Sequence, residues 1–248
     1  ENGVFKIGDT RYSKSFAFDD ISFKTKNDED QQAIYDAYLR FLNQISFGED
    51  IFITFVNYKE DEDTKLASVL PLYKQDGFNV YREELSTVLK NNMALSRNSI
   101  STKRYITVYV NADTVEAAMQ RLSILEGELT TSFKKISGTP LRPLDLAERL
   151  EVINLILNPE SPTDAKGKTS IDYDLLKKQH LTTKDIVCPE SLKFYSNRFE
   201  INERVGQAMY LDGIANFMDT NFLTEIVSVN FESVFTLHIS AWEQADAI

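Results

Sequence analysis

The sequence predicts an α+β protein in which helices pack against mixed or antiparallel sheets. Two long segments, residues 28–46 and 113–136, carry apolar side chains at intervals of three and four, which is typical of helices with one buried face. Residues 104–110 alternate between the two faces of a strand. Because 42% of the residues are hydrophobic and only 9 are glycine and 6 proline, the chain can bury an ordered core.

Residues 1–98 are predicted to form an N-terminal α/β subdomain. It contains a strand at residues 16–23, the helix at residues 28–46, and a strand at residues 51–56 that is apolar on both faces and is therefore expected to be buried on both. A second helix is predicted from Tyr81 to Leu95. The apolar stripes of the two helices comprise Ile34, Ala37, Tyr38, Phe41, Leu42 and Ile45 in the first, and Tyr81, Leu85, Val88 and Leu89 in the second.

Residues 99–248 are predicted to form a ferredoxin-like subdomain, βαββαβ with an inserted helix. Asp113 is the predicted N-cap of its first helix, and Glu116 can reach back to complete a capping box. The first strand places Ile106, Val108 and Val110 on one face and Tyr105, Thr107 and Tyr109 on the other. The later elements are predicted at residues 143–157 (inserted helix), 192–201 (two strands), 205–211 (strand), 219–229 (helix) and 231–240 (strand), with a flexible loop at residues 158–170.

The loop at residues 162–170, PTDAKGKTS, ends in the Gly-Lys-Thr of a phosphate-binding P-loop. A P-loop needs glycine at its first position so that the backbone can wrap around the phosphates. That position holds Pro162, which has no backbone N–H to donate. We therefore interpret the segment as a connector. The alternative, a stand-alone phosphate- or nucleotide-binding enzyme that uses residues 162–170, stays open.

The charge and composition exclude some classes of function. With 27 basic and 38 acidic residues the net charge is −11, which argues against direct binding to nucleic acid, including stacking of single-stranded DNA on tyrosines. Cys188 is the single cysteine, so no intramolecular disulfide can form. The first residue is not Met, and residues 241–248 resemble the beginning of a helix, so we expect this chain to be a piece of a longer protein.

The residues that could carry chemistry are few. His180 lies in a polar segment, His238 lies on the polar side of its strand and is expected to face solvent, and Cys188 is expected to be buried and inert. The sequence therefore predicts no catalytic, cofactor-binding or metal site. Interaction surfaces favour tyrosine and methionine, and the candidates of that kind, for which core packing is the alternative, are Tyr105, Tyr109, Met209 and Tyr210.

Several dispersed motifs, read in order, resemble a known family. They are NGVFKIGDTRYS at residues 2–13, SISTKRYITVYVNAD at 99–113, AAMQRL at 117–122, FKK at 133–135, PLDLAERLE at 143–151, LTTKDIVCP at 181–189 and FEIN at 199–202. Their order is similar to the N-terminal domain of the conjugation ATPases of type IV secretion systems. That family includes the fourth VirB protein and the TraE, TrbE and CagE types, and the likeness is greatest to proteins of Gram-positive plasmids and integrative elements.

This resemblance implies a function for the whole protein. Such proteins carry a RecA-like motor with a true P-loop, which would lie C-terminal to this chain and would use ATP and Mg²⁺. They form oligomers, often hexamers, in the cytoplasm at the inner face of the membrane, where they power DNA and protein transfer. The N-terminal domain is implicated in peripheral membrane contact and in docking to channel components and the coupling protein. The resemblance thus implies that residues 1–248 have no enzymatic activity of their own.

Overall fold

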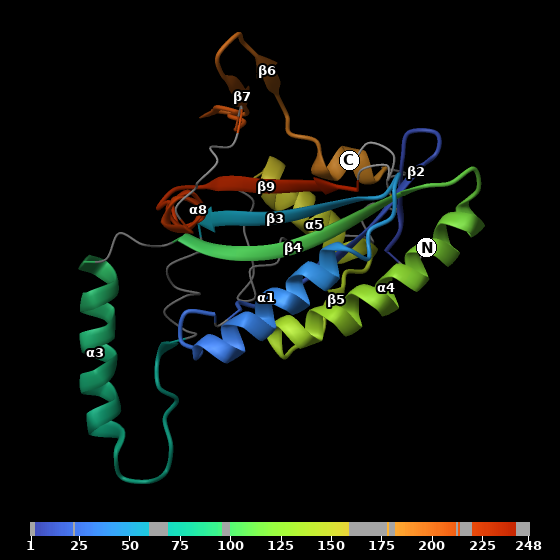
Figure 1. Ribbon diagram of the computed structural model, residues 1–248. Helices are drawn as coiled ribbons and strands as arrows, with labels where there is room; N and C mark the ends of the chain where they lie inside the picture. Colours follow the sequence, from blue (N-terminus) through green and yellow to red (C-terminus); the bar gives the residue numbers. More distant parts are fainter. Residues whose placement is uncertain are drawn as a thin grey trace. The chain divides into compact units, whose positions relative to one another are not determined.

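The computed structural model describes residues 3–21, 23–59, 69–95, 100–158, 178, 182–211, 213 and 220–241. It confirms the predicted α+β class, with helices and antiparallel sheets (Figure 1). The chain divides into two compact units, each assembled from separate stretches of sequence. Unit 1 comprises Glu1–Val56, Lys103–Arg149 and Val234–Ile248, and unit 2 comprises Asn57–Thr102 and Leu150–Ser233.

The main sheet belongs largely to unit 1 and has the strand order β1-β2-β4-β3-β9. Its strands are β1 (Phe5–Ile7), β2 (Arg11–Ala17), β3 (Asp50–Lys59), β4 (Ile100–Asn111) and β9 (Ser233–Ser240), and the short β5 (Arg142–Pro143) also pairs with β2. β2 and β4 run antiparallel, with Tyr12 opposite Val110 and Phe16 opposite Ile106. Side-chain contacts of β3 to β9 run in opposite order along the two strands, from Thr54–Thr236 to Phe52–His238, so this pair is antiparallel as well.

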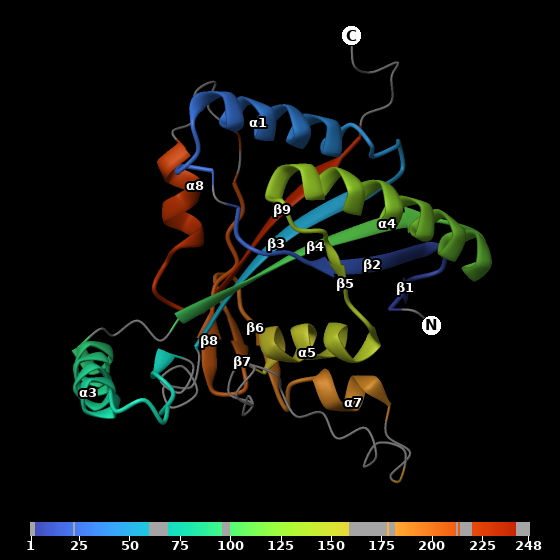
Figure 2. The same cartoon turned by 90° about the horizontal axis from the view of Figure 1, so that it is seen from below.

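Helices α1 (Asp28–Leu42) and α4 (Val115–Ser137) lie side by side on one face of this sheet (Figures 1 and 2). The apolar side chains that recur at intervals of three and four in α1 and in α4 face the core. Phe133 of α4 packs edge to face on Phe41 of α1, with ring centroids 5.9 Å apart. Burying each such side chain stabilises the fold by roughly 1.5–3 kcal/mol. The buried apolar residues of this layer are Tyr12, Phe16, Phe41, Ile51, Ile106, Val108, Val110, Ala118, Leu122, Leu125, Leu129, Phe133, Ile136 and Leu141.

The ends of both helices follow from local chemistry. The side chain of Asn27 accepts a hydrogen bond from the backbone N–H of Asp30 at 2.8 Å and caps α1. α4 is capped by Thr114, which accepts from the backbone N–H of Ala117 at 3.2 Å, so the prediction that Asp113 is the cap is wrong by one residue. α4 ends at Gly138, whose φ of 80° is the left-handed conformation that glycine adopts without strain.

The predicted division at residue 98 does not match the compact units. The βαββαβ order is present, but it is made by β2, α1, β3, β4, α4 and β9, which span residues 11–240 rather than 99–248. Both neighbours of β4 in the sheet, β2 and β3, come from the N-terminal part of the chain. The predicted ferredoxin-like subdomain at residues 99–248 is therefore wrong, because its first strand would have no partner within that segment.

Unit 2 contains α3 (Asn79–Leu95), most of α5 (Leu146–Leu157), α7 (Thr183–Val187), α8 (Thr220–Val227) and a second sheet. This sheet has the order β6-β7-β8 and consists of β6 (Leu192–Phe194), β7 (Phe199–Ile201) and β8 (Arg204–Gly206). The first two strands confirm the predicted hairpin. The strand predicted at residues 205–211 ends at Gly206, over which the ring of Phe199 lies so closely that a Cβ would come within 2.3 Å of it.

Candidate functional site

The face of the main sheet opposite α1 and α4 carries a closed cluster of aromatic and charged side chains in unit 1. We call Arg11, Asp50, Phe52, Tyr109 and His238 the cross-strand cluster, because they come from four neighbouring strands. The guanidinium of Arg11 lies 4.7 Å from the ring centroid of Tyr109. Tyr109 meets Phe52 edge to face at 4.8 Å, and Phe52 stacks on His238 at 4.3 Å. Asp50 closes the ring, because its carboxylate pairs with Arg11 and lies 3.1 Å from Nε2 of His238.

The chemistry of the cross-strand cluster favours a structural role. His238 is half-exposed, which confirms that it faces solvent, and Asp50 orients its ring. An activated nucleophile would need a hydroxyl or thiol within hydrogen-bond reach of the imidazole. Among the residues that the structure describes, the hydrogen bond of His238 is to Asp50, and no serine, threonine or cysteine binds it. Arg11 and Asp50 form an ion pair with each other. The contacts of the cluster therefore link four strands.

A buried arginine fixes the start of the chain beside this face. Arg149, in the first turn of α5, donates from Nη1 to the carbonyl oxygens of Gly3 and Ser13, both at 2.8 Å, and from Nη2 to Oγ of Ser13 at 2.9 Å. Its guanidinium lies 3.9 Å from the ring centroid of Phe5. Burial lowers the pKa of Arg149 to about 10, although the nearby Tyr109 opposes this shift. Within the described part of the chain no carboxylate pairs with Arg149, and nothing in the sequence signalled its burial.

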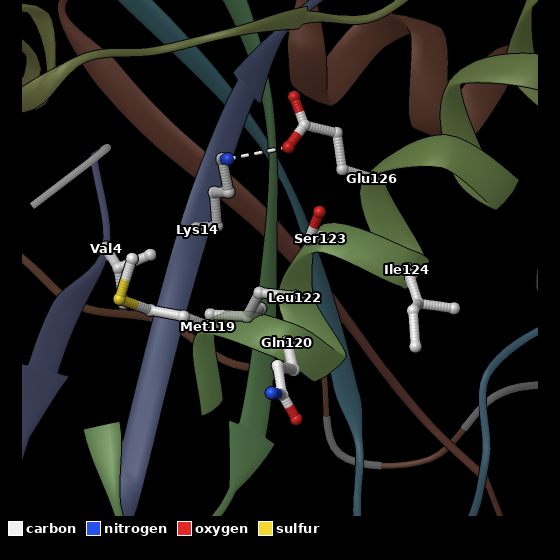
Figure 3. Close-up of a pocket in the computed structure, with 8 residues that line it drawn as sticks. All are labelled: Val4, Lys14, Met119, Gln120, Leu122, Ser123, Ile124 and Glu126. Atoms are coloured by element: carbon white, nitrogen blue, oxygen red, sulfur yellow. Dashed lines mark hydrogen bonds and ion pairs between the residues drawn. The ribbon is translucent and has the colours of Figure 1, made fainter. Parts of the chain in front are cut away.

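A hollow of about 630 Å³ lies between β2 and α4, and Figure 3 shows the residues that line it. Nζ of Lys14 lies 2.6 Å from Oε2 of Glu126, so the two charges that line the hollow neutralise each other. The volume falls within the roughly 300–1,000 Å³ of ligand pockets, but the remaining lining offers one hydroxyl and one amide. The lining residues are Val4, Lys14, Met119, Gln120, Leu122, Ser123, Ile124 and Glu126. The arrangement provides apolar contact rather than groups for a reaction.

The predicted interaction residues fall into two sets. Tyr105 is only 8% exposed, and Tyr109 is part of the cross-strand cluster, so both serve the main sheet. Met209 and Tyr210, in contrast, are 82% and 86% exposed in the segment that follows β8. The first two residues lie in unit 1 and the last two in unit 2.

Met209 and Tyr210 follow β8, and other large apolar side chains in unit 2 are exposed as well. Large hydrophobic side chains of β6, of the turn after it and of β8 are exposed together with them. Large apolar side chains that stay in water are typical of interaction sites when they lie together. We call this set the hairpin patch, and its members are Leu192, Phe194, Tyr195, Val205, Met209, Tyr210 and Leu211.

Of the other residues singled out in the sequence, only Cys188 lies in the described part of the chain without having been placed above. Cys188 is exposed at the end of α7, so the prediction that it is buried is wrong: its side chain follows the last turn of a five-residue helix instead of entering a core. His180 and the loop at residues 162–170 lie outside the described residues. In the described part of the chain no three histidine, cysteine, aspartate or glutamate side chains come together as metal ligands would.

Compared with protein-family models and with curated proteins, the chain matches none. Across the residues that the structure describes, no helix combines the length and the apolar character needed to cross a membrane.

Proposed function

We propose that this chain is a non-catalytic docking domain of the motor ATPase of a conjugative type IV secretion system. In this proposal the domain binds channel components and the coupling protein at the cytoplasmic base of the channel, while ATP hydrolysis belongs to a separate motor domain. The order of sequence motifs supports the family, and the exposed hairpin patch supports docking. The proposal includes self-association of the whole motor and peripheral contact with the membrane.

The observation that carries the docking role is the exposure of Met209 and Tyr210. An aromatic side chain buries about 150–250 Å² when a partner covers it, and each large apolar side chain so covered contributes roughly 1.5–3 kcal/mol. Leaving both in water forgoes that free energy. Tyrosine and methionine are also enriched in the centres of interfaces, so the hairpin patch has the composition of a surface that a partner covers.

Binding to purified channel proteins tests this proposal. The chain is immobilised and titrated with the cytoplasmic segments of the channel components and of the coupling protein. We expect one of them to bind, and the double variant Met209→Ser/Tyr210→Ser to weaken that binding at least tenfold. Ile124→Ser is the matched control, because Ile124 is a 54% exposed apolar residue on α4, outside the hairpin patch. If the wild-type chain binds none of these proteins, the docking proposal fails.

A second titration separates docking from the nucleotide-binding alternative. Calorimetry of the chain with ATP and Mg²⁺ is expected to give no heat of binding. Micromolar binding that disappears in Lys168→Ala would show that residues 162–170 hold a phosphate after all. That result would contradict the docking proposal and favour an enzyme that binds nucleotide by itself.

A further inference from the structure

A second apolar surface in unit 2 lies on α3 and the turn that precedes it. Phe78, Tyr81, Leu85 and Val88 recur at intervals of three, four and three, so they share one side of the helix. We call these four residues the α3 stripe. Their exposed fractions lie between 49% and 67%. The sequence predicted three of these side chains, Tyr81, Leu85 and Val88, on one side of a helix, and all four side chains of the stripe are exposed.

Polar groups beside the α3 stripe form hydrogen bonds and an ion pair within residues 74–82. The carboxylate of Asp76 pairs with both terminal nitrogens of Arg82 and accepts the backbone N–H of Phe78 at 3.1 Å. Arg82 first, and then this backbone N–H, lower the pKa of Asp76 to about 2. The side-chain amide of Asn79 donates to the carbonyl of Lys74 at 2.9 Å and accepts its N–H at 3.2 Å. We call Asp76, Asn79 and Arg82 the α3 clip.

The α3 clip holds the turn against the start of the helix and fixes Phe78 in line with the stripe. Polar groups are therefore satisfied inside the segment while large apolar groups point outward, the opposite of what a helix facing water requires. Ordering the anchor side chains before binding reduces the entropy lost on association. Anchors at i, i+3, i+7 and i+10 are the pattern with which an amphipathic helix enters an apolar groove.

The charge of the segment indicates what kind of surface can cover it. Residues 69–95 contain three basic and three acidic side chains, so their net charge is zero. Helices that lie on anionic membranes carry an excess of lysine and arginine on the polar face. α3 has no such excess, because its two basic residues are balanced by two acidic ones. Glu84 borders the stripe, and no ion pair to it forms among the described residues. A covering surface that is apolar, with a basic side chain at its rim, complements this arrangement.

Size argues against a second copy of the same helix as the partner. α3 has 17 residues and is therefore about 25 Å long. Two helices of this length pressed together bury less than the roughly 1,200 Å² at which stable interfaces begin. A groove that encloses three sides of one helix buries more of each anchor.

We propose that α3 is a docking helix whose stripe enters an apolar groove of a partner protein, and that a basic residue at the rim of this groove lies beside Glu84. This surface is separate from the hairpin patch, so either can fail without the other. It also does not depend on the partner being a secretion protein.

Photo-crosslinking in the source cells tests the proposal on the intact protein. A photoreactive amino acid is placed at position 81, 85 or 88 in the stripe, and at position 83, 87 or 90 on the opposite side of the helix. We expect cross-links from the stripe positions to one partner protein, at an apolar surface, at least tenfold stronger than from the opposite side. Met209→Ser/Tyr210→Ser is expected to leave them unchanged.

Several outcomes would overturn the proposal. An adduct with the mass of two chains would assign the stripe to self-association, and a phospholipid adduct would assign it to the membrane. Cross-links within one chain would show that the protein covers its own stripe. Equal cross-linking from both sides of α3, or no cross-linking at all, would show that the stripe is not a docking surface. With the purified partner, Leu85→Ser/Val88→Ser is expected to raise the Kd about 10- to 100-fold and the control Thr87→Ser to leave it unchanged.

Discussion

Arg149 shows how one side chain organises a stretch of backbone. It satisfies two buried carbonyl groups and one hydroxyl, and its plane covers Phe5. Its folded pKa, about 10, lies below the ordinary value of an arginine, because burial disfavours the charged form. At neutral pH the charge itself therefore opposes folding. The hydrogen bonds and the ring contact must offset that cost for the arrangement to persist.

Replacing Arg149 by alanine is expected to lower the free energy of unfolding by about 2–3 kcal/mol, because two buried carbonyl oxygens lose their donor. Urea denaturation of purified protein measures this difference. Arg142→Ala is the control, since Arg142 is largely exposed and pairs with Glu148 at the surface, where such pairs contribute less than about 1 kcal/mol. Equal losses in both variants would mean that the bonds of Arg149 contribute nothing special.

At the scale of elements, β9 is the strand whose attachment depends most on a few side chains. It lies at the end of the main sheet and pairs with β3 alone among the described strands. His238 stacks on Phe52 and binds Asp50, and Thr236 meets Thr54 at 3.2 Å. These contacts lie on one face of the strand, so the cross-strand cluster is the attachment of β9 on that face.

We expect His238→Ala to loosen β9 locally. Loss of the stacked ring and of the bond to Asp50 amounts to about 1 kcal/mol, so amides of β9 should exchange about fivefold faster while those of β2 and β4 keep their rates. Hydrogen exchange followed by mass spectrometry resolves the strands. Ser240→Ala, an exposed position in the same strand, serves as the control. Unchanged exchange in β9 would show that the cluster does not hold it.

The sequence predicted those helices and strands in which apolar residues recur at regular intervals because one face is buried. The stripes of α1 and α4 and the buried face of β4 are confirmed, because each has one face turned to the core. The strand at residues 205–211 was predicted too long, since alternation gives no information about where a partner strand ends. Met209 and Tyr210 are exposed, and their role in an interaction stays a prediction. Arg149 could not be predicted, because its burial depends on backbone groups of residues 3 and 13.

The molecule as a whole is divided in space but not along the sequence. β3 and β4 each begin or end in one unit and continue into the other. Segment boundaries in the sequence consequently give no indication of the two units, because the main sheet, which lies largely in unit 1, combines strands that are far apart in the chain. Local sequence patterns therefore predict a boundary between two subdomains at residue 98, and the compact units of the structure do not have this boundary.

Fragments made by cutting the chain between residues 98 and 99 are expected not to fold. Residues 99–248 alone would leave β4 without β2 and β3, exposing the apolar face that contains Ile106, Val108 and Val110. The ¹H–¹⁵N spectrum of this fragment should show the narrow dispersion of an unfolded chain, and adding residues 1–98 should restore dispersed peaks. A well-dispersed spectrum from residues 99–248 by themselves would restore the two-subdomain division.

The position of β9 in the sequence also affects synthesis of the protein on the ribosome. The strand that completes the main sheet is the last described strand of the chain, more than ninety residues after α4. While translation proceeds, β3 has therefore left the exit tunnel long before its outer neighbour is made. Until β9 is made, the outer edge of β3 has no partner among the described strands, and its backbone N–H and C=O groups face water.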